Sequence, residues 1–224
     1  MSAASLPVSV DVFSDVVCPW CLIGKRRLEK AIALKPEIAV EVHYQPYFLN
    51  PWVPHEGLSR REYLTAKFGS PQRYQAIAER VAAVARGEGL AYNIERVSRQ
   101  PNTRDCHRLI LWAGSIGQAA AMKQRLMDLY FTEGGDLSDP EVLVQAARDC
   151  GLDDEEVRAH LAGQTDVALV EEAAKAAQEA GIDGVPFFVF GQALAVSGAQ
   201  PAEYLAAAIE QAARPPGLPQ APAN

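Results

Sequence analysis

Apolar and polar positions alternate near the start of the chain. Residues 8–13, VSVDVF, have the period-two pattern of a half-buried strand. A helical pattern begins at Pro19, whose missing N–H is tolerated in a first helical turn, and it continues until Pro36 ends it. Residues 38–44, IAVEVHY, alternate again as a strand does. The N-terminal part of the chain therefore predicts a β-α-β unit.

A helical period replaces this alternation from about residue 59 to residue 180. Asn102 is placed to cap one helix of this block, and Asp139 followed by Pro140 predicts the start of another. No strand-like run interrupts the pattern. We therefore expect an all-helical insertion.

Strand-like patterning returns near the C-terminus. In residues 185–198, VPFFVFGQALAVSG, two apolar runs flank Gly191 and Gln192, which predicts a β-hairpin. A last helix is expected to begin at Pro201. The order of elements is then β-α-β, a helical block, a β-hairpin and a final helix.

These patterns predict the domain organisation of an α/β protein. Short strand units cannot each bury a sheet face alone, so the two ends of the chain are expected to share one sheet. The expected parts are a sheet domain of residues 1–58 and 181–213, a helical insertion of 59–180, and a Pro/Ala-rich disordered tail of 214–224.

Composition narrows the classes of protein that fit. With 49% hydrophobic and 22% charged residues, the 224-residue chain resembles an ordinary globular protein. It has no run of about 18 apolar residues, so we expect no membrane association. A net charge of -7 without a Lys/Arg cluster argues against nucleic-acid binding. The N-terminus has neither the basic nor the apolar region of a signal peptide, so a cytoplasmic location and reduced thiols are expected.

Two cysteines stand three positions apart in DVVCPWCLIG, residues 15–24. The pattern places Cys18 at a helix N-cap and Cys21 in the first turn. A thiolate at Cys18 would be stabilised by unpaired backbone N–H groups and by the positive end of the helix dipole, which lowers a thiol pKa. Cys21 is then spaced to resolve a mixed disulfide formed on Cys18. A redox-active pair is the favoured interpretation.

Two alternatives compete with this interpretation of the pair. A zinc site needs two further donors, and the sequence has neither a second CxxC nor a closely spaced pair of histidines. Cys106 and His107 are adjacent, and adjacent helical residues point in different directions. We therefore expect no metal. Two inert buried thiols remain as a less favoured alternative, because free cysteine is often buried.

CPWC after a strand, the long helical block and VPFFVF followed by SGAQ together resemble the DsbA-type thioredoxin superfamily. The most similar branch is the FrnE-like one, which neighbours 2-hydroxychromene-2-carboxylate isomerases and kappa-class glutathione transferases. The resemblance extends to about residue 212. It implies a thioredoxin-like fold interrupted by a helical insertion, with Cys18 as the nucleophilic cysteine and Cys21 as the resolving one.

The resemblance also implies a substrate-binding wall. Val185 and Pro186 match the position of a cis-proline that faces the cysteines, where the backbone before the proline binds an extended substrate or glutathione. From the residues alone, Pro186 fits equally well as the first residue of a strand. Pro19 and Trp20 would add an apolar docking surface, and packing of Trp20 against the insertion is the alternative.

Auxiliary residues are expected around the pair. Asp15 can relay a proton or orient the site, but we favour a simple turn cap. PNTRDCHRL, residues 101–109, is similar to a stretch that opens an insertion helix in the FrnE-like branch, and it brings in Asn102. His107 can also contribute, although a position on the helix surface is the favoured expectation.

A cysteine marks a departure from the branch. Cys106 stands where the resemblance leads us to expect alanine, so a third thiol near the pair, or pairing with Cys150, is possible. Helical spacing instead predicts that both cysteines face the core.

The sequence thus predicts a protein disulfide oxidoreductase or isomerase that works by dithiol–disulfide exchange. No tightly bound cofactor is expected, and glutathione is a candidate co-substrate. The partner is a thiol- or disulfide-bearing protein or small molecule, and both a monomer and a homodimer remain open. Because Pro-Trp replaces the histidine that stabilises the thiolate in DsbA, we expect a Cys18 pKa above about 3.5 and a potential more reducing than about -120 mV.

Two other functions remain as alternatives. The first is a glutathione-dependent isomerase or transferase of the 2-hydroxychromene-2-carboxylate or kappa type. The relatives of that type usually have serine where this chain has Cys18, which counts against it. The second is a non-catalytic redox sensor or client-binding module, in which a Cys18–Cys21 disulfide changes the shape of the protein.

Overall fold

A computed structural model describes residues 6–214 of the chain. The expected disordered tail, apart from Arg214, and the first five residues lie outside this range. The elements follow the chain as β1 (Val8–Ser14), α1 (Pro19–Ala33), β2 (Val40–Pro46), β3 (Leu58–Ser59), α2 (Arg60–Phe68), α3 (Pro71–Gly87), η1 (Ile94–Arg96), β4 (Arg99–Gln100), α4 (Arg104–Gly114), α5 (Ala119–Asp128), η2 (Leu129–Glu133), α6 (Pro140–Asp149), α7 (Asp154–Ala162), α8 (Val167–Glu179), β5 (Phe187–Phe190), β6 (Leu194–Ser197) and α9 (Ala202–Ala212).

The main sheet has the strand order β2-β1-β5-β6. β1 runs parallel to β2 and antiparallel to β5, so strands from both ends of the chain meet at its centre. β5 and β6 form the predicted hairpin, and both Gly191 and Gln192 have positive φ in its turn. The two ends of the chain therefore share one sheet of an α/β fold, as the apolar pattern predicts.

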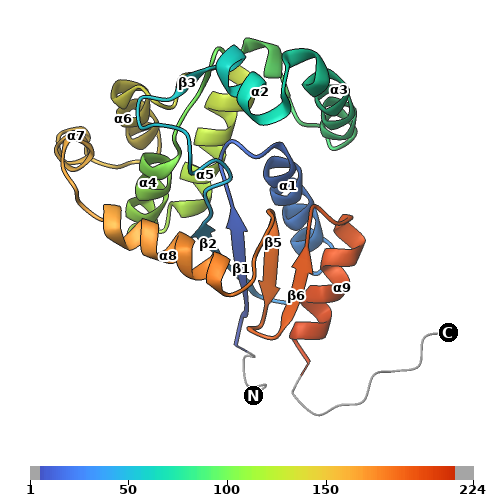
Figure 1. The fold of residues 1–224 in the computed structure, drawn as a ribbon. Helices are drawn as coiled ribbons and strands as arrows, with labels where there is room; N and C mark the ends of the chain where they lie inside the picture. The colour runs from blue at the N-terminus through green and yellow to red at the C-terminus, as the bar shows by residue number, and fades with distance from the viewer. Residues whose placement is uncertain (1–5, 215–224) are drawn as a thin grey trace.

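Helices α1 and α9 cover one face of this sheet (Figure 1). Buried and half-buried residues alternate along β1. Val10 and Val12 are therefore in the core, beside Phe188 and Phe190 of β5. Leu28 of α1 packs into the same cluster. Each full burial of an aliphatic side chain contributes about 1.5–3 kcal/mol, so this face fixes the position of α1 on the sheet.

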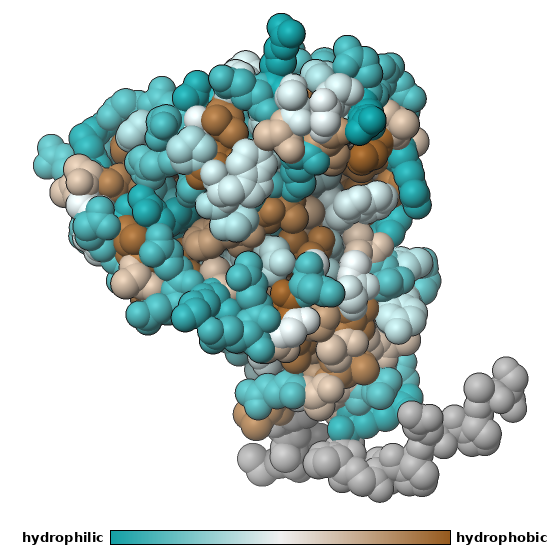
Figure 2. Space-filling model, viewed as in Figure 1, coloured by the Kyte–Doolittle hydropathy of each residue, from teal (hydrophilic) through white to brown (hydrophobic). Residues whose placement is uncertain are grey.

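The helical block lies beside and above the sheet, with α8 next to β2 and with α2 and α3 above the end of β1 at which α1 begins (Figure 1). In the space-filling view, apolar surface shows in the middle of the face, between the upper helices and the sheet (Figure 2). None of the described helices has the length and apolar character needed to cross a membrane.

The block is not wholly helical, which corrects the sequence-based expectation. β3, at its N-terminal border, pairs antiparallel with β4 inside it, Leu58 with Gln100 and Ser59 with Arg99. Each strand has only two residues, which is too short for a period-two pattern to appear in the sequence.

Gly24 of α1 marks the closest approach between α1 and the segment before β5. A Cβ atom added there would lie 2.8 Å from Pro186 Cγ and 3.2 Å from Phe188 Cζ. We expect Gly24→Ala to lower the free energy of unfolding by about 1–3 kcal/mol in urea denaturation, because the core must shift to admit the methyl group. Gly87→Ala at the end of α3 is the control, since no atom lies within 4 Å of its added Cβ. Equal destabilisation by both substitutions would contradict this prediction.

Candidate active site

The two cysteines lie where β1 passes into α1. The turn after β1 is closed by the backbone hydrogen bond from Cys18 N–H to Asp15 O, at 3.2 Å. Cys18 is the N-cap of α1 with an extended backbone, and Pro19 opens the helix, as predicted. Cys18 is 3% exposed and Cys21 is 1% exposed, and both are free thiols. The strand therefore ends at a pair of sheltered thiols at a helix N-terminus.

The surroundings give the two thiols opposite acidities. The pKa of Cys18 is lowered chiefly by the hydrogen bond that the Cys21 thiol donates to its sulfur, and further by the backbone N–H groups of Cys21 and Trp20, although burial opposes this. Burial raises the pKa of Cys21 well above its ordinary value, and its hydrogen bond to Cys18 acts in the same direction. Cys18 is thus the more readily ionised sulfur, and Cys21 keeps its proton.

The segment before β5 forms the opposite wall. The peptide bond between Val185 and Pro186 is cis. The Cys18 thiol lies 3.7 Å from Val185 O, to which it can donate a hydrogen bond. The two residues are 167 positions apart in the chain, and the pairing of β1 with β5 brings them together.

Asp15 ties the turn before Cys18 to the helical block. Its side chain is completely buried and accepts hydrogen bonds from Leu49 N–H at 2.8 Å and from Thr103 Oγ1 at 3.2 Å. It also accepts a long bond from Val17 N–H, so the favoured turn role holds only in part. Burial opposes ionisation, but the contacts with His107 and with Leu49 N–H outweigh it and hold the pKa of Asp15 below its usual value.

A cavity of about 200 Å³ opens beside Cys18; we call it the Cys18 cavity. Cys18, Trp20 and Val185 contribute to its lining, and Pro19 borders it as well. Side chains from the helical block line the rest, among them Arg60, Tyr63, Lys67, Phe68, Tyr74 and Tyr130. Trp20 also packs against the apolar clusters of the block, so the cavity wall and the packing role coincide.

Comparison with known proteins agrees with this geometry. The DSBA-like thioredoxin domain matches residues 9–210. The chain belongs to this family. A probable DsbA oxidoreductase from Streptomyces coelicolor is 38% identical to this chain, and its structure has a TM-score of 0.84. The match covers 92% of this chain and 89% of that protein.

Two more distant structures share the fold of this DSBA-like chain. A 2-hydroxychromene-2-carboxylate isomerase has a TM-score of 0.68 at 16% identity, over 91% of this chain and 95% of the other. The cytosolic disulfide reductase DsbM from Pseudomonas aeruginosa, solved with GSH, has a TM-score of 0.63 at 18% identity, over 91% and 98%. The thioredoxin-like fold with a helical insertion is therefore confirmed.

His107 lies in the interior of this DSBA-like chain, so the expected position on a helix surface is wrong. It is 4% exposed, its ring meets Phe48 edge-on at 5.6 Å, and its Nε2 lies 3.7 Å from Asp15 Oδ1. Burial keeps the pKa of His107 below its ordinary value. The loop that follows β2 covers this face of α4, and a helical period cannot reveal such a cover.

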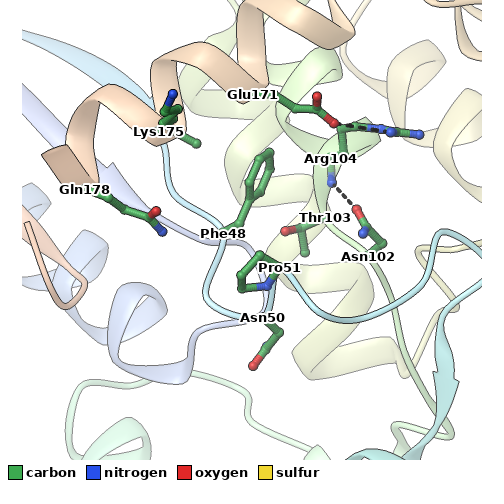
Figure 3. A pocket seen from close by; sticks show the side chains of 10 residues that line it. Phe48, Asn50, Pro51, Asn102, Thr103, Arg104, Glu171, Lys175 and Gln178 are labelled. Atoms are coloured by element: carbon green, nitrogen blue, oxygen red, sulfur yellow. Dashed lines mark hydrogen bonds and ion pairs between the residues drawn. The ribbon is translucent and has the colours of Figure 1, made fainter.

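Asn102 caps α4 with its side chain, as predicted: it accepts a hydrogen bond from the N–H of Arg104, the first residue of the helix, at 3.0 Å, whereas Thr103 at the N-cap position makes no such bond. Asn102 also donates a hydrogen bond to Val53 O at 2.7 Å. It lines a second cavity of about 260 Å³ between the loop after β2, α4 and α8, where Arg104 pairs with Glu171 (Figure 3). Asn102 is therefore not among the residues that line the Cys18 cavity.

Cys106 and Cys150 differ in burial. Cys106 is completely buried, as the spacing predicts, and burial raises its pKa well above the ordinary value. Cys150 is only half-buried at the C-cap of α6, so the expectation of a core position holds in part. Both are free thiols, so a disulfide between them is not present.

Sequence reasoning missed Lys123 of α5. Its side chain is 1% exposed, and Nζ donates a hydrogen bond to Ser14 O at 3.2 Å, directly before Asp15. The available signal was its position beside Met122, Leu126 and Met127, which form the buried face of α5. A lysine on an apolar helical face is rarely buried without a partner, and here the end of β1 supplies one.

Proposed function

We propose that the protein is a thiol–disulfide oxidoreductase whose reacting groups are Cys18 and Cys21. The observation that supports this proposal is the position of two free thiols at the N-terminus of α1, opposite the cis peptide bond before Pro186, where the surroundings lower the pKa of Cys18 and raise that of Cys21. Exchange needs this division, because a thiolate attacks first and a second thiol must wait to resolve the product.

The reaction would proceed in two displacements. The Cys18 thiolate attacks one sulfur of a substrate disulfide, the substrate S–S bond breaks, and one substrate thiolate leaves. Cys21 then loses its proton and attacks Cys18 Sγ, which releases the second substrate thiolate and forms the Cys18–Cys21 disulfide. Two electrons pass from the protein to the substrate, and the reverse sequence oxidises a substrate dithiol.

The surrounding residues would position these steps. Val185 O stands beside Cys18 Sγ and is placed to meet the bound substrate. Asp15 and His107 would keep the turn before Cys18 fixed against α4, which makes them positioning residues. Glutathione is the co-substrate that we propose, in keeping with the GSH-bound DsbM structure. We also propose that the protein works in a reducing compartment such as the cytosol.

Equilibration of the reduced protein with glutathione redox buffers tests this function. We expect a Cys18–Cys21 disulfide, located by peptide mapping, and a potential more reducing than about -120 mV. A potential at or above that value would contradict the expected direction. Oxidation confined to Cys106 or Cys150, or no oxidation of any pair, would contradict the function itself.

The pH dependence of alkylation tests the ionisation of Cys18. The thiolate fraction rises with pH, so the iodoacetamide rate should reach half its maximum below the ordinary thiol pKa of about 8.5. In Cys21→Ala the midpoint should move upward, since the hydrogen bond that chiefly lowers the Cys18 pKa is lost. A midpoint above that of a free thiol in the wild-type protein would show that burial outweighs the hydrogen bond.

A glutathione-dependent isomerase is the second candidate, supported by the fold shared with 2-hydroxychromene-2-carboxylate isomerase. Incubation of Cys18→Ala with a 2-hydroxychromene-2-carboxylate and glutathione separates the two candidates. Turnover that survives this substitution would favour the isomerase.

A further inference from the structure

Two basic side chains of α2 converge on one aromatic ring above Cys18. The guanidinium carbon of Arg60 lies 5.5 Å from the centre of the Tyr63 ring, and Lys67 Nζ lies 5.7 Å from the same centre. Arg60 also lies 5.0 Å from the centre of the Tyr74 ring. Both cations line the Cys18 cavity. The cavity therefore holds two like charges above a reactive sulfur.

Neither cation is neutralised by a carboxylate within residues 6–214. Arg60 donates a 3.4 Å hydrogen bond to the Tyr130 hydroxyl, and Lys67 donates a 2.5 Å hydrogen bond to Asn50 Oδ1. Arg27 and Lys30, by contrast, both form ion pairs with Glu88. An anion bound in the cavity that both side chains line would be attracted to both positive charges.

The charge of the cavity is local and opposes that of the chain. The whole protein carries a net charge of -7, which by itself slows the approach of anions. A preference for anions at Cys18 would therefore have to come from the residues of the cavity. Burial holds the pKa of Lys67 below its ordinary value, although the charges of Cys18 and Asp15 oppose this shift.

The shape of the cavity favours a small substrate over a folded protein. Cys18 is only 3% exposed, and the space beside it is about 200 Å³, enclosed by α2, α3 and η2. The rings of Tyr63, Phe68 and Tyr74 give this space flat apolar walls. A small disulfide can enter such a space, whereas a protein disulfide would have to protrude into it.

We propose that the substrate of Cys18 is a low-molecular-weight disulfide that carries a carboxylate, which Arg60 and Lys67 bind while the Cys18 thiolate attacks the neighbouring sulfur. This proposal rests on the thiol–disulfide function proposed above. The disulfide is the oxidant: its S–S bond breaks, two thiolates leave in succession, and the protein is left with a Cys18–Cys21 disulfide. The proton of Cys21 goes to a released thiolate or to solvent.

Three matched disulfides test the proposal with the full-length reduced protein. They are 3,3'-dithiodipropionate, which is anionic, 2-hydroxyethyl disulfide, which is neutral, and cystamine, which is cationic. The rate constant for formation of the Cys18–Cys21 disulfide is divided by that of a free neutral thiol with the same reagent. We expect the corrected rate to be roughly tenfold to a hundredfold higher for the anionic disulfide than for the neutral one, and lowest for cystamine.

Substitutions in α2 identify the source of this preference. Arg60→Gln and Lys67→Gln should each reduce the ratio of the anionic rate to the neutral rate by about tenfold, and an unchanged urea unfolding midpoint shows that the variants are folded. Lys67→Arg should retain the ratio. Arg61→Gln is the matched control, because Arg61 is exposed on the same helix and does not line the cavity. An unchanged preference in both Gln variants would overturn the assignment.

Equal corrected rates for the three disulfides would overturn the inference and leave the thiol–disulfide function standing. Failure of all three to oxidise the Cys18–Cys21 pair would contradict the proposed function itself. Faster oxidation by insulin disulfides than by 3,3'-dithiodipropionate would overturn the small-substrate assignment and point to a protein substrate.

Discussion

Cys18→Ala should reduce the rate of disulfide exchange by roughly a thousandfold or more, as the loss of a reacting nucleophile does in other enzymes. The other three thiols are less readily ionised, and burial raises the pKa of Cys21 well above its ordinary value. Cys106 is completely buried with a raised pKa, and Cys150 also has a raised pKa. The measurement is the single-turnover oxidation of the reduced protein by 2-hydroxyethyl disulfide, followed by the loss of free thiols.

Cys21→Ala should behave differently, and this difference makes the prediction specific. The attack by Cys18 remains possible, but the product cannot be resolved, so a mixed disulfide between Cys18 and half of the reagent should accumulate and be visible by mass spectrometry. Cys150→Ala is the control and should match the wild type. A mixed disulfide found on Cys21 in the Cys18→Ala variant would reverse the roles assigned to the two cysteines.

Arg108→Met should lower the free energy of unfolding by about 3–5 kcal/mol, the cost of breaking a buried charged network. Arg108 is 1% exposed and closes the segment between α7 and α8. Its guanidinium donates hydrogen bonds to Thr165 O at 2.7 Å, to His160 O at 2.5 Å and to Gly163 O at 3.2 Å. It also pairs with Asp105 at 2.8 Å. Methionine keeps much of the volume but removes all of these contacts, and within residues 6–214 only His160 O and Asp105 keep another partner, Gly163 N–H and His55 respectively.

Arg158→Met is the matched control for that loss. Arg158 pairs with Glu141, and the two side chains are 48% and 67% exposed. An exposed pair of this kind contributes up to about 1 kcal/mol, so the urea midpoint should change little. Similar losses in Arg108→Met and Arg158→Met would show that the buried network contributes no more than a surface pair.

The sequence by itself determined the features that depend on neighbours along the chain. The alternation in β1, the proline at the start of α1 and the Gly191-Gln192 turn each act through local backbone preference, so their positions could be predicted. The same local logic placed Cys18 at the N-cap of α1. The role that we propose for the pair followed from that position together with the resemblance to the DsbA-type superfamily.

Local patterning failed where a distant segment decides burial. His107 is made an interior group only by the loop after β2. For Lys123 the apolar helical face was a local signal, but its partner at the end of β1 was not visible in the sequence. The pairing of β3 with β4 was missed for the same reason, since two-residue strands form only because a partner is present.

The tertiary structure alone decided what surrounds Cys18. The approach of Val185 to its sulfur spans 167 positions of the chain, and the sheet register sets it. The convergence of Arg60 and Lys67 on the Cys18 cavity depends on how α2 lies across that cavity from the N-terminus of α1. Such contacts between remote segments form because their apolar faces are buried against each other. The apolar pattern of one segment does not specify which other segment its apolar face will contact.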